Sequence, residues 1–140
     1  MMRAIQCAVV VGLVFLAGCD ILALNMVHVS LVNSSDYDVE VELYISDQQE
    51  LPEVLLTELG DELQYTISAG QTVSFSRDCD ELQAIMIEDA DLQVIGGIGP
   101  EASTGVLRDG DDFNCGSFIT FTFDHSDEIL DFDITVRTIP

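Results

Sequence analysis

The sequence contains no lysine and no tryptophan, and its four basic residues are all arginines. Against them stand 26 acidic residues, all of which follow Cys19 in the chain, and the formal net charge is −22 at pH 7. Such a scarcity of cations argues against binding to nucleic acid, which depends on neutralising phosphates with basic side chains. An anionic membrane surface would repel the chain as well.

Charge is missing from residues 4–17, where Gln6 is the one clearly polar side chain. Arg3 precedes this apolar run and small residues end it, which is the layout of a secretory signal peptide. The last residues, Leu16-Ala17-Gly18-Cys19, resemble the lipobox of bacterial lipoproteins. The resemblance implies that residues 1–18 are removed as the signal peptide and that the Cys19 thiol carries a diacylglyceryl group, with palmitate on the mature protein.

Two alternatives to lipidation stay open from the residues alone. Residues 21–24 extend the apolar stretch to about the 20 residues of a membrane-spanning helix, although Asp20 would be costly within it. A secreted protein cut after a small residue is the other alternative. Because two or more acyl chains hold a protein stably on a membrane, lipidation predicts a bacterial cell-envelope protein whose domain faces the periplasm or the exterior.

Cysteine is scarce, with four in the chain. Cys7 would leave with the signal peptide and Cys19 would carry the lipid, so that Cys79 and Cys115 remain in a compartment where disulfides persist. We predict a structural disulfide between them, which closes a loop of about 37 residues and stabilises the fold by about 4 kcal/mol in the chain-entropy model. Neither cysteine lies in a CxxC motif or near a histidine at ligand spacing, which argues against zinc or redox chemistry.

Residues 19–140 are expected to form a single acidic domain of ordinary size. Apolar and polar residues alternate along it with a period of two, the pattern of half-buried strands. We therefore predict an all-β fold, an antiparallel β-sandwich of about eight strands. The strand-like segments are residues 27–31, 39–45, 63–67, 73–79, 82–88, 92–95, 117–124 and 129–139.

Residues 50–59 also fit a short helix that begins at Pro52 and that Gly60-Asp61 ends. Part of the chain resembles the opening half of immunoglobulin-like or transthyretin-like exported β domains. The resemblance lies in the order of Val32-Asn33-Ser34-Ser35, a strand-like segment at 39–44 and the stretch 67–75. The Cys-Gly turn in Phe113-Asn114-Cys115-Gly116 is similar to one in small bacterial lipoproteins. These resemblances imply a fold and an envelope location, and they imply no activity.

Oxygen ligands concentrate in residues 108–114, where Asp109, Asp111 and Asp112 are candidate ligands of a metal ion. Calcium takes six to eight oxygens, but this stretch is not an EF-hand, because the ligand order fails after Asp111 and no closing glutamate follows. A solvated turn is the alternative. Further ligands would come from a second acidic cluster if folding joins the two. That cluster consists of Asp124, Asp127, Glu128, Asp131 and Asp133.

No catalytic pattern emerges around His28 and His125, the two histidines of the chain. Asp124 precedes His125, but neighbouring residues of a strand point to opposite faces, and the Gly-x-Ser-x-Gly and HExxH motifs are absent. The glycine-rich residues 95–101 lack the lysine and hydroxyl of a phosphate loop. We expect a lipid-anchored, non-enzymatic binding or structural module, with an envelope protein or glycan as ligand and no cofactor other than calcium. The alternatives are a calcium-dependent binding domain and an envelope hydrolase.

Overall fold

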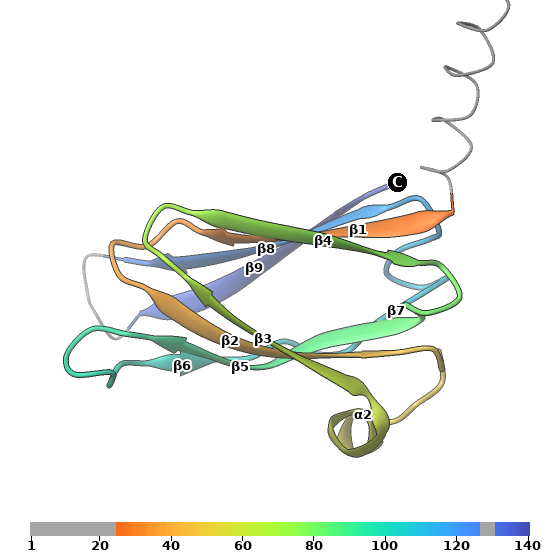
Figure 1. Ribbon diagram of the computed structural model, residues 1–140, viewed down its shortest axis with the longest axis horizontal. Helices are drawn as coiled ribbons and strands as arrows, with labels where there is room; N and C mark the ends of the chain where they lie inside the picture. The colour runs from red at the N-terminus through yellow and green to blue at the C-terminus, as the bar shows by residue number, and fades with distance from the viewer. Residues whose placement is uncertain (1–24, 127–130) are drawn as a thin grey trace, which may run out of the picture.

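The alternating segments fold into two β-sheets that face each other (Figure 1). A computed structural model describes residues 25–126 and 131–140. The predicted signal peptide, Cys19, Asp127 and Glu128 therefore lie outside the described residues. The prediction of an all-β sandwich is confirmed.

The four-stranded sheet has the order β4 (Thr72–Asp78), β1 (Met26–Asn33), β8 (Phe118–His125) and β9 (Phe132–Ile139). The other sheet has the order β3 (Asp61–Ile67), β2 (Val39–Ser46), β5 (Ala84–Leu92) and β6 (Glu101–Ala102), and β7 (Leu107–Arg108) also pairs with β5. Among these strands one pair, β1 with β8, runs parallel, with His28 opposite Phe118. Every other named pair is antiparallel, as predicted.

The core lies between the two sheets and is made by alternate residues of each strand. In β8, Ile119, Phe121 and Phe123 are fully buried, whereas Phe118 on the opposite face is 52% exposed. This is the period-two arrangement that the sequence predicts. The aliphatic side chains of the core include Val27, Val29 and Leu31 of β1 and Val39, Val41, Leu43 and Ile45 of β2.

Strand β5 differs from the prediction, which divided it into segments 82–88 and 92–95. The structure has one strand, Ala84–Leu92, and residues 93–95 lie beyond its end. The pairing with β2 shifts at Glu42/Leu43, so that Glu42 lies opposite Asp89 but Leu43 lies opposite Ile87. Glu88 is thus the extra residue of a β-bulge, which reverses the alternation of faces along the strand.

The helical alternative for residues 50–59 is confirmed by α2 (Glu53–Leu59), which follows Pro52. Its buried residue, Leu56, packs in a second small core on the outer side of the five-stranded sheet, with Tyr44, Leu51 and Met86. Among the described residues, no helix combines the length and the apolar character that crossing a membrane requires.

The predicted disulfide joins Cys79 and Cys115, whose Cα atoms lie 5.4 Å apart at a sequence separation of 36. Cys79 follows the last residue of β4, and Cys115 lies in the loop before β8. Because β1 lies between β4 and β8, the bridge links the two neighbours of β1 at the end where that strand begins.

Candidate functional site: an acidic groove on the five-stranded sheet

Acidic residues are divided unevenly between the two sheets. In the four-stranded sheet they are limited to Asp78, Asp124 and Asp133, each at or next to a strand end. Strands β2, β3, β5 and β6 carry many more and contain no basic residue to balance them. Their acidic residues are Glu40, Glu42, Asp61, Glu62, Glu88, Asp89, Asp91 and Glu101.

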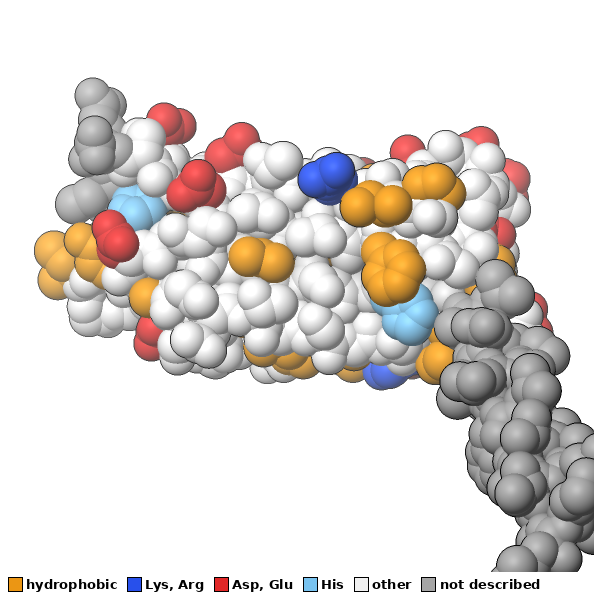
Figure 2. All heavy atoms as spheres, turned by 90° about the horizontal axis from the view of Figure 1, so that it is seen from above, with side chains coloured by type: hydrophobic (Ala, Val, Ile, Leu, Met, Phe, Trp, Pro, Cys, Tyr) orange, Lys and Arg blue, Asp and Glu red, His pale blue; other side chains and the backbone are white. Residues whose placement is uncertain are grey.

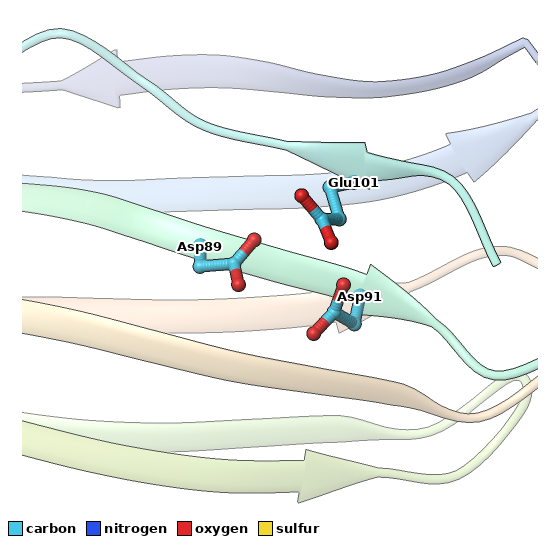
Figure 3. A group of neighbouring side chains, drawn as sticks. All are labelled: Asp89, Asp91 and Glu101. Atoms are coloured by element: carbon cyan, nitrogen blue, oxygen red, sulfur yellow. The ribbon is translucent and has the colours of Figure 1, made fainter. Parts of the chain in front are cut away.

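Three of these carboxylates converge on adjacent strands (Figure 3). Asp89 and Asp91 lie two residues apart on β5, and Asp91 pairs with Glu101 of β6. Each of the three offers a carboxylate oxygen, and these oxygens all lie within 4.8 Å of one another. The bulge at Glu88 contributes to this arrangement, because it sets Asp89 opposite Glu42 on the neighbouring strand.

Burial, hydrogen bonding and nearby negative charge change the acidity of two groups. Burial, and then the carboxylates of Asp91 and Glu101, raise the pKa of the Asp89 carboxyl above its ordinary value, although a backbone hydrogen bond from Ala90 lowers it. Tyr44 donates a hydrogen bond of 2.5 Å to Glu42. That bond, followed by burial and nearby carboxylates, raises the pKa of Tyr44 to about 12. The charged forms of both groups are therefore disfavoured in the fold.

Beside the carboxylates, the outer face of the sheet is hollowed into an open groove of about 440 Å³. Its floor and walls come from β2, β3 and β5, and no basic residue is among those that line it. The lining residues are Glu40, Val41, Glu42, Gln64, Tyr65, Thr66, Asp89 and Asp91.

This arrangement suits a cationic ligand. A hard divalent ion such as calcium is bound by carboxylate oxygens together with waters, and Asp89, Asp91 and Glu101 could supply three such oxygens. Arginine or lysine side chains of a partner would relieve the same crowding by charge-assisted hydrogen bonds. The groove therefore favours a ligand that carries positive charge.

The residues predicted as calcium ligands occupy a different place. Asp109, Asp111 and Asp112 lie in the turn after β7, where the Asp112 carboxylate accepts a hydrogen bond of 2.8 Å from the backbone N–H of Arg108. Among the described residues they do not belong to a group of three converging metal-ligand side chains. The calcium site in this turn stays a prediction.

The second acidic cluster lies far from that turn. Asp124 is near the end of β8, whereas the turn precedes the start of the same strand. With about 3.3 Å per residue, the eight residues of β8 hold the two groups apart. Asp127 and Glu128 fall outside the described residues, so Asp124, Asp131 and Asp133 alone mark the position of the second cluster.

Sequence reasoning missed Asp89, Asp91 and Glu101. The alternation of Asp89 and Asp91 was a signal that their side chains share one strand face. Their convergence with Glu101 depends on the pairing of β5 with β6, which the sequence pattern does not disclose.

The two histidines take part in packing contacts. The Asp124 carboxylate accepts a hydrogen bond from the backbone N–H of His125, and the His125 ring lies edge-on to Tyr37 with centroids 5.6 Å apart. The ring of His28 stacks on Phe118 at 4.7 Å, and its Nδ1 lies 2.7 Å from Ser76 Oγ. Asp124 therefore does not orient the imidazole of His125 as a catalytic triad would require.

No protein-family model matches the sequence, and no curated protein matches it significantly. Solved structures that are similar to the chain include the following two. The crystal structure of the T6SS lipoprotein TssJ1 from Pseudomonas aeruginosa is 10% identical, with 83% of this chain and 97% of that chain covered and a TM-score of 0.48. The NMR structure of a protein from Eubacterium rectale is 14% identical, with 80% and 88% covered and a TM-score of 0.45. These likenesses concern the fold alone.

Proposed function

We propose that this chain is a lipid-anchored protein of the bacterial cell envelope and that its β-sandwich is a non-enzymatic binding or structural module. The observation that carries the proposal is the Leu16-Ala17-Gly18-Cys19 motif at the end of an uncharged, apolar N-terminal run. The disulfide between Cys79 and Cys115 supports it, because structural disulfides form and persist in exported proteins.

In this proposal the acidic groove is the binding surface. Its lining combines Asp89, Asp91, Glu40 and Glu42 without any basic residue, so it favours a ligand that brings positive charge. Basic side chains on an envelope protein have that chemistry, and a neutral glycan would leave the carboxylates crowded. A protein ligand with exposed arginine or lysine therefore fits the groove better than a glycan does.

Metabolic labelling tests the anchor. The full chain is expressed in a bacterium that processes lipoproteins, in the presence of labelled palmitate, beside the Cys19→Ser variant. We expect label and membrane association in the unchanged protein and neither in the variant, with an intact mass that starts at Cys19. Recovery of an unlabelled chain that still begins with Met1 would overturn the proposal.

A second candidate function is calcium-dependent binding, which the convergence of Asp89, Asp91 and Glu101 within 4.8 Å favours. A cation that binds only the native state raises its stability, by about 2.7 kcal/mol at one hundred times the dissociation constant. Millimolar calcium should then raise the melting temperature of the unchanged protein but not that of Asp91→Asn. Asp111→Asn is the matched comparison, since it removes a carboxylate from the calcium site that the sequence predicts in residues 108–114. A melting temperature that calcium leaves unchanged would eliminate this candidate.

A further inference from the structure

The outer face of the four-stranded sheet is nearly free of acidic residues, in a chain whose net charge is −22. Figure 2 shows this face from above, with a mostly uncharged surface, several hydrophobic side chains and acidic residues toward its edges. Asp78, Asp124 and Asp133 are the acidic residues of its four strands. Its centre is formed largely by hydroxyl and aliphatic side chains, namely Ser30, Val32, Ser74, Ser76, Thr120, Thr122 and Thr135.

We call the outer face of the four-stranded sheet the neutral face. Its exposed hydrophobic residues gather at the end where β1 begins. Phe118 is 52% exposed and Ile139 is 45% exposed, and the two are cross-strand partners in β8 and β9. His28 of β1 stacks on Phe118 with ring centroids 4.7 Å apart. Met26, the first residue of β1, lies two residues before His28 on the same face of the strand.

We propose that the neutral face is the side of the domain that lies against the lipid bilayer, with Phe118 and Ile139 in the headgroup region. The inference rests on the proposed lipid anchor at Cys19. The neutral face thus contacts the same membrane that holds the lipid anchor, and this contact orients the domain on the membrane.

The length of chain between the anchor and the domain supports this orientation. Six residue steps separate Cys19 from Asn25, and even a fully extended chain spans only about 21 Å over that distance. An acyl chain in the bilayer would therefore keep the start of β1 close to the headgroups. The exposed pair Phe118 and Ile139 lies beside that strand start.

The distribution of charge decides which side turns to the lipid. If the five-stranded sheet faced the membrane, Asp89, Asp91, Glu101 and their neighbours would lie against an anionic surface, which repels them. The end near the anchor also carries acidic residues, with Asp78, Asp80 and Glu81 around the disulfide. With the neutral face against lipid, the first group points away from the membrane, and of the second group only Asp78 lies on this face, at the last residue of β4.

The neutral face also offers favourable contacts to lipid. Arg137 is exposed on β9 and would attract anionic headgroups. Serine and threonine hydroxyls can donate hydrogen bonds to phosphate oxygens. With this face against lipid, the acidic groove on the other sheet points away from the membrane, where a partner can reach it.

A tryptophan reporter tests the orientation, because the natural chain has no tryptophan. Phe118→Trp places a single reporter on the neutral face. Thr66→Trp places one beside the acidic groove, which Thr66 lines, and is the matched control. Both lipidated proteins are reconstituted into vesicles of phosphatidylethanolamine, phosphatidylglycerol and dibrominated phosphatidylcholine. We expect the emission of the Phe118→Trp protein to shift to the blue and to be quenched at least two-fold more than that of the control.

A second variant protects the test against a local effect of the reporter. Adding Ser74→Asp to the Phe118→Trp protein puts a negative charge on the neutral face opposite Ser30, where no basic residue pairs with it, and should reduce the quenching, while acylation and flotation with vesicles persist. Persistence of the full quenching in this double variant would overturn the inference.

The remaining outcomes separate the orientation from the anchor. Equal quenching of both reporters, or no quenching of either in acylated protein that floats with vesicles, would overturn the orientation and leave the anchor standing. A blue shift that grows with protein concentration without quenching would assign the face to a second copy of the chain and overturn the lipid contact. Protein that lacks the acyl mass at Cys19 would overturn the anchor and the inference together.

Discussion

At the scale of single residues, Asn33 shows how a local motif can serve the fold. Asn33-Ser34-Ser35 matches a glycosylation acceptor, but the Asn33 side chain is only 1% exposed. Its Nδ2 donates hydrogen bonds of 2.8 Å to the carbonyls of Tyr37 and Ile67. Its Oδ1 accepts from the backbone and the hydroxyl of Ser35. The amide therefore holds the turn after β1 against the end of β3.

Replacing Asn33 by alanine should lower the free energy of unfolding by about 2–3 kcal/mol, since it removes the buried hydrogen bonds that the Asn33 amide makes to the carbonyl of Ile67 and to the backbone N–H of Ser35. Urea denaturation of Asn33→Ala beside the unchanged domain measures the loss. Asn114→Ala, in an exposed loop, is the control and should change the stability by less than about 0.5 kcal/mol. Equal stability of the two variants would show that the hydrogen bonds of Asn33 do not hold the turn.

Asp89 is a residue whose charge opposes folding. Burial and the carboxylates of Asp91 and Glu101 raise its pKa in the folded protein, whereas an unfolded aspartate titrates near about 3.9. At neutral pH both states are ionised, and the folded state bears the unfavourable burial and repulsion. As the pH falls through the raised pKa, the folded state takes up a proton first and this penalty disappears.

Asp89→Asn should therefore raise the stability at neutral pH, by about 0.5 kcal/mol for a partly exposed carboxylate. The gain over the unchanged domain should shrink as the pH falls through the acid range toward about 4. Thermal melts across that range measure it, with the exposed Asp47→Asn as the control. A gain that is the same at every pH would contradict the assignment of the penalty to ionisation.

At the scale of secondary structure, the sequence predicts most strands because each has one face in the core. In β1 and the first half of β2 the alternation of Val and Leu with polar residues agrees with the observed burial. At the end of β2 it does not, because Tyr44 on the outer face is buried in the small core beside α2. The pattern failed in β5, where the bulge at Glu88 reverses the alternation, so that one strand looked like two. A bulge is defined by the pairing between strands, which one segment alone does not contain.

The parallel pairing of β1 with β8 could not be predicted from the sequence for the same reason, and neither could the convergence of Asp89, Asp91 and Glu101. Both depend on contacts between segments far apart in the chain, such as His28 with Phe118 and Asp91 with Glu101. The disulfide was predictable despite its separation of 36 residues, because elimination left one pair of cysteines. The disulfide could thus be predicted from the number of cysteines, whereas strand pairing could not be predicted from the alternation within single segments.

The disulfide should stabilise the four-stranded sheet at the start of β1. Removing it in the double variant Cys79→Ala, Cys115→Ala should lower the free energy of unfolding by about 2–4 kcal/mol. Cys79 donates its backbone N–H to the carbonyl of Asn25, so hydrogen exchange should speed up first in residues 25–28. Mass spectrometry of peptides from β1 and β9 measures this, with β9 as the internal control. Equal acceleration in both strands would mean that the bridge acts on the unfolded chain alone.

At the scale of the whole molecule, the two faces of the sandwich differ in charge. The four-stranded sheet carries acidic residues only near strand ends, and the five-stranded sheet gathers them around its groove. A net charge far from zero keeps a protein soluble and at the same time destabilises its compact state through self-repulsion. Because the acidic residues cluster, the repulsion should be concentrated on one sheet rather than spread over the surface.

Salt should therefore stabilise the domain chiefly through the acidic groove. The screening length falls from about 30 Å at 0.01 M to about 10 Å at 0.1 M ionic strength, so the melting temperature should rise with sodium chloride in the presence of a chelator. Neutralising the convergent carboxylates, in Asp89→Asn, Asp91→Asn, Glu101→Gln, should remove much of that rise.

A comparison triple makes the same change in net charge at exposed sites outside the groove, in Asp47→Asn, Asp80→Asn, Asp111→Asn. If clustering determines the repulsion, this triple keeps most of the salt dependence, because its carboxylates contribute little to the crowding at Asp89. If the two triples lose the same salt dependence, net charge alone governs stability and the groove has no special share in it. Thermal melts of the three proteins at matched ionic strengths separate the two results.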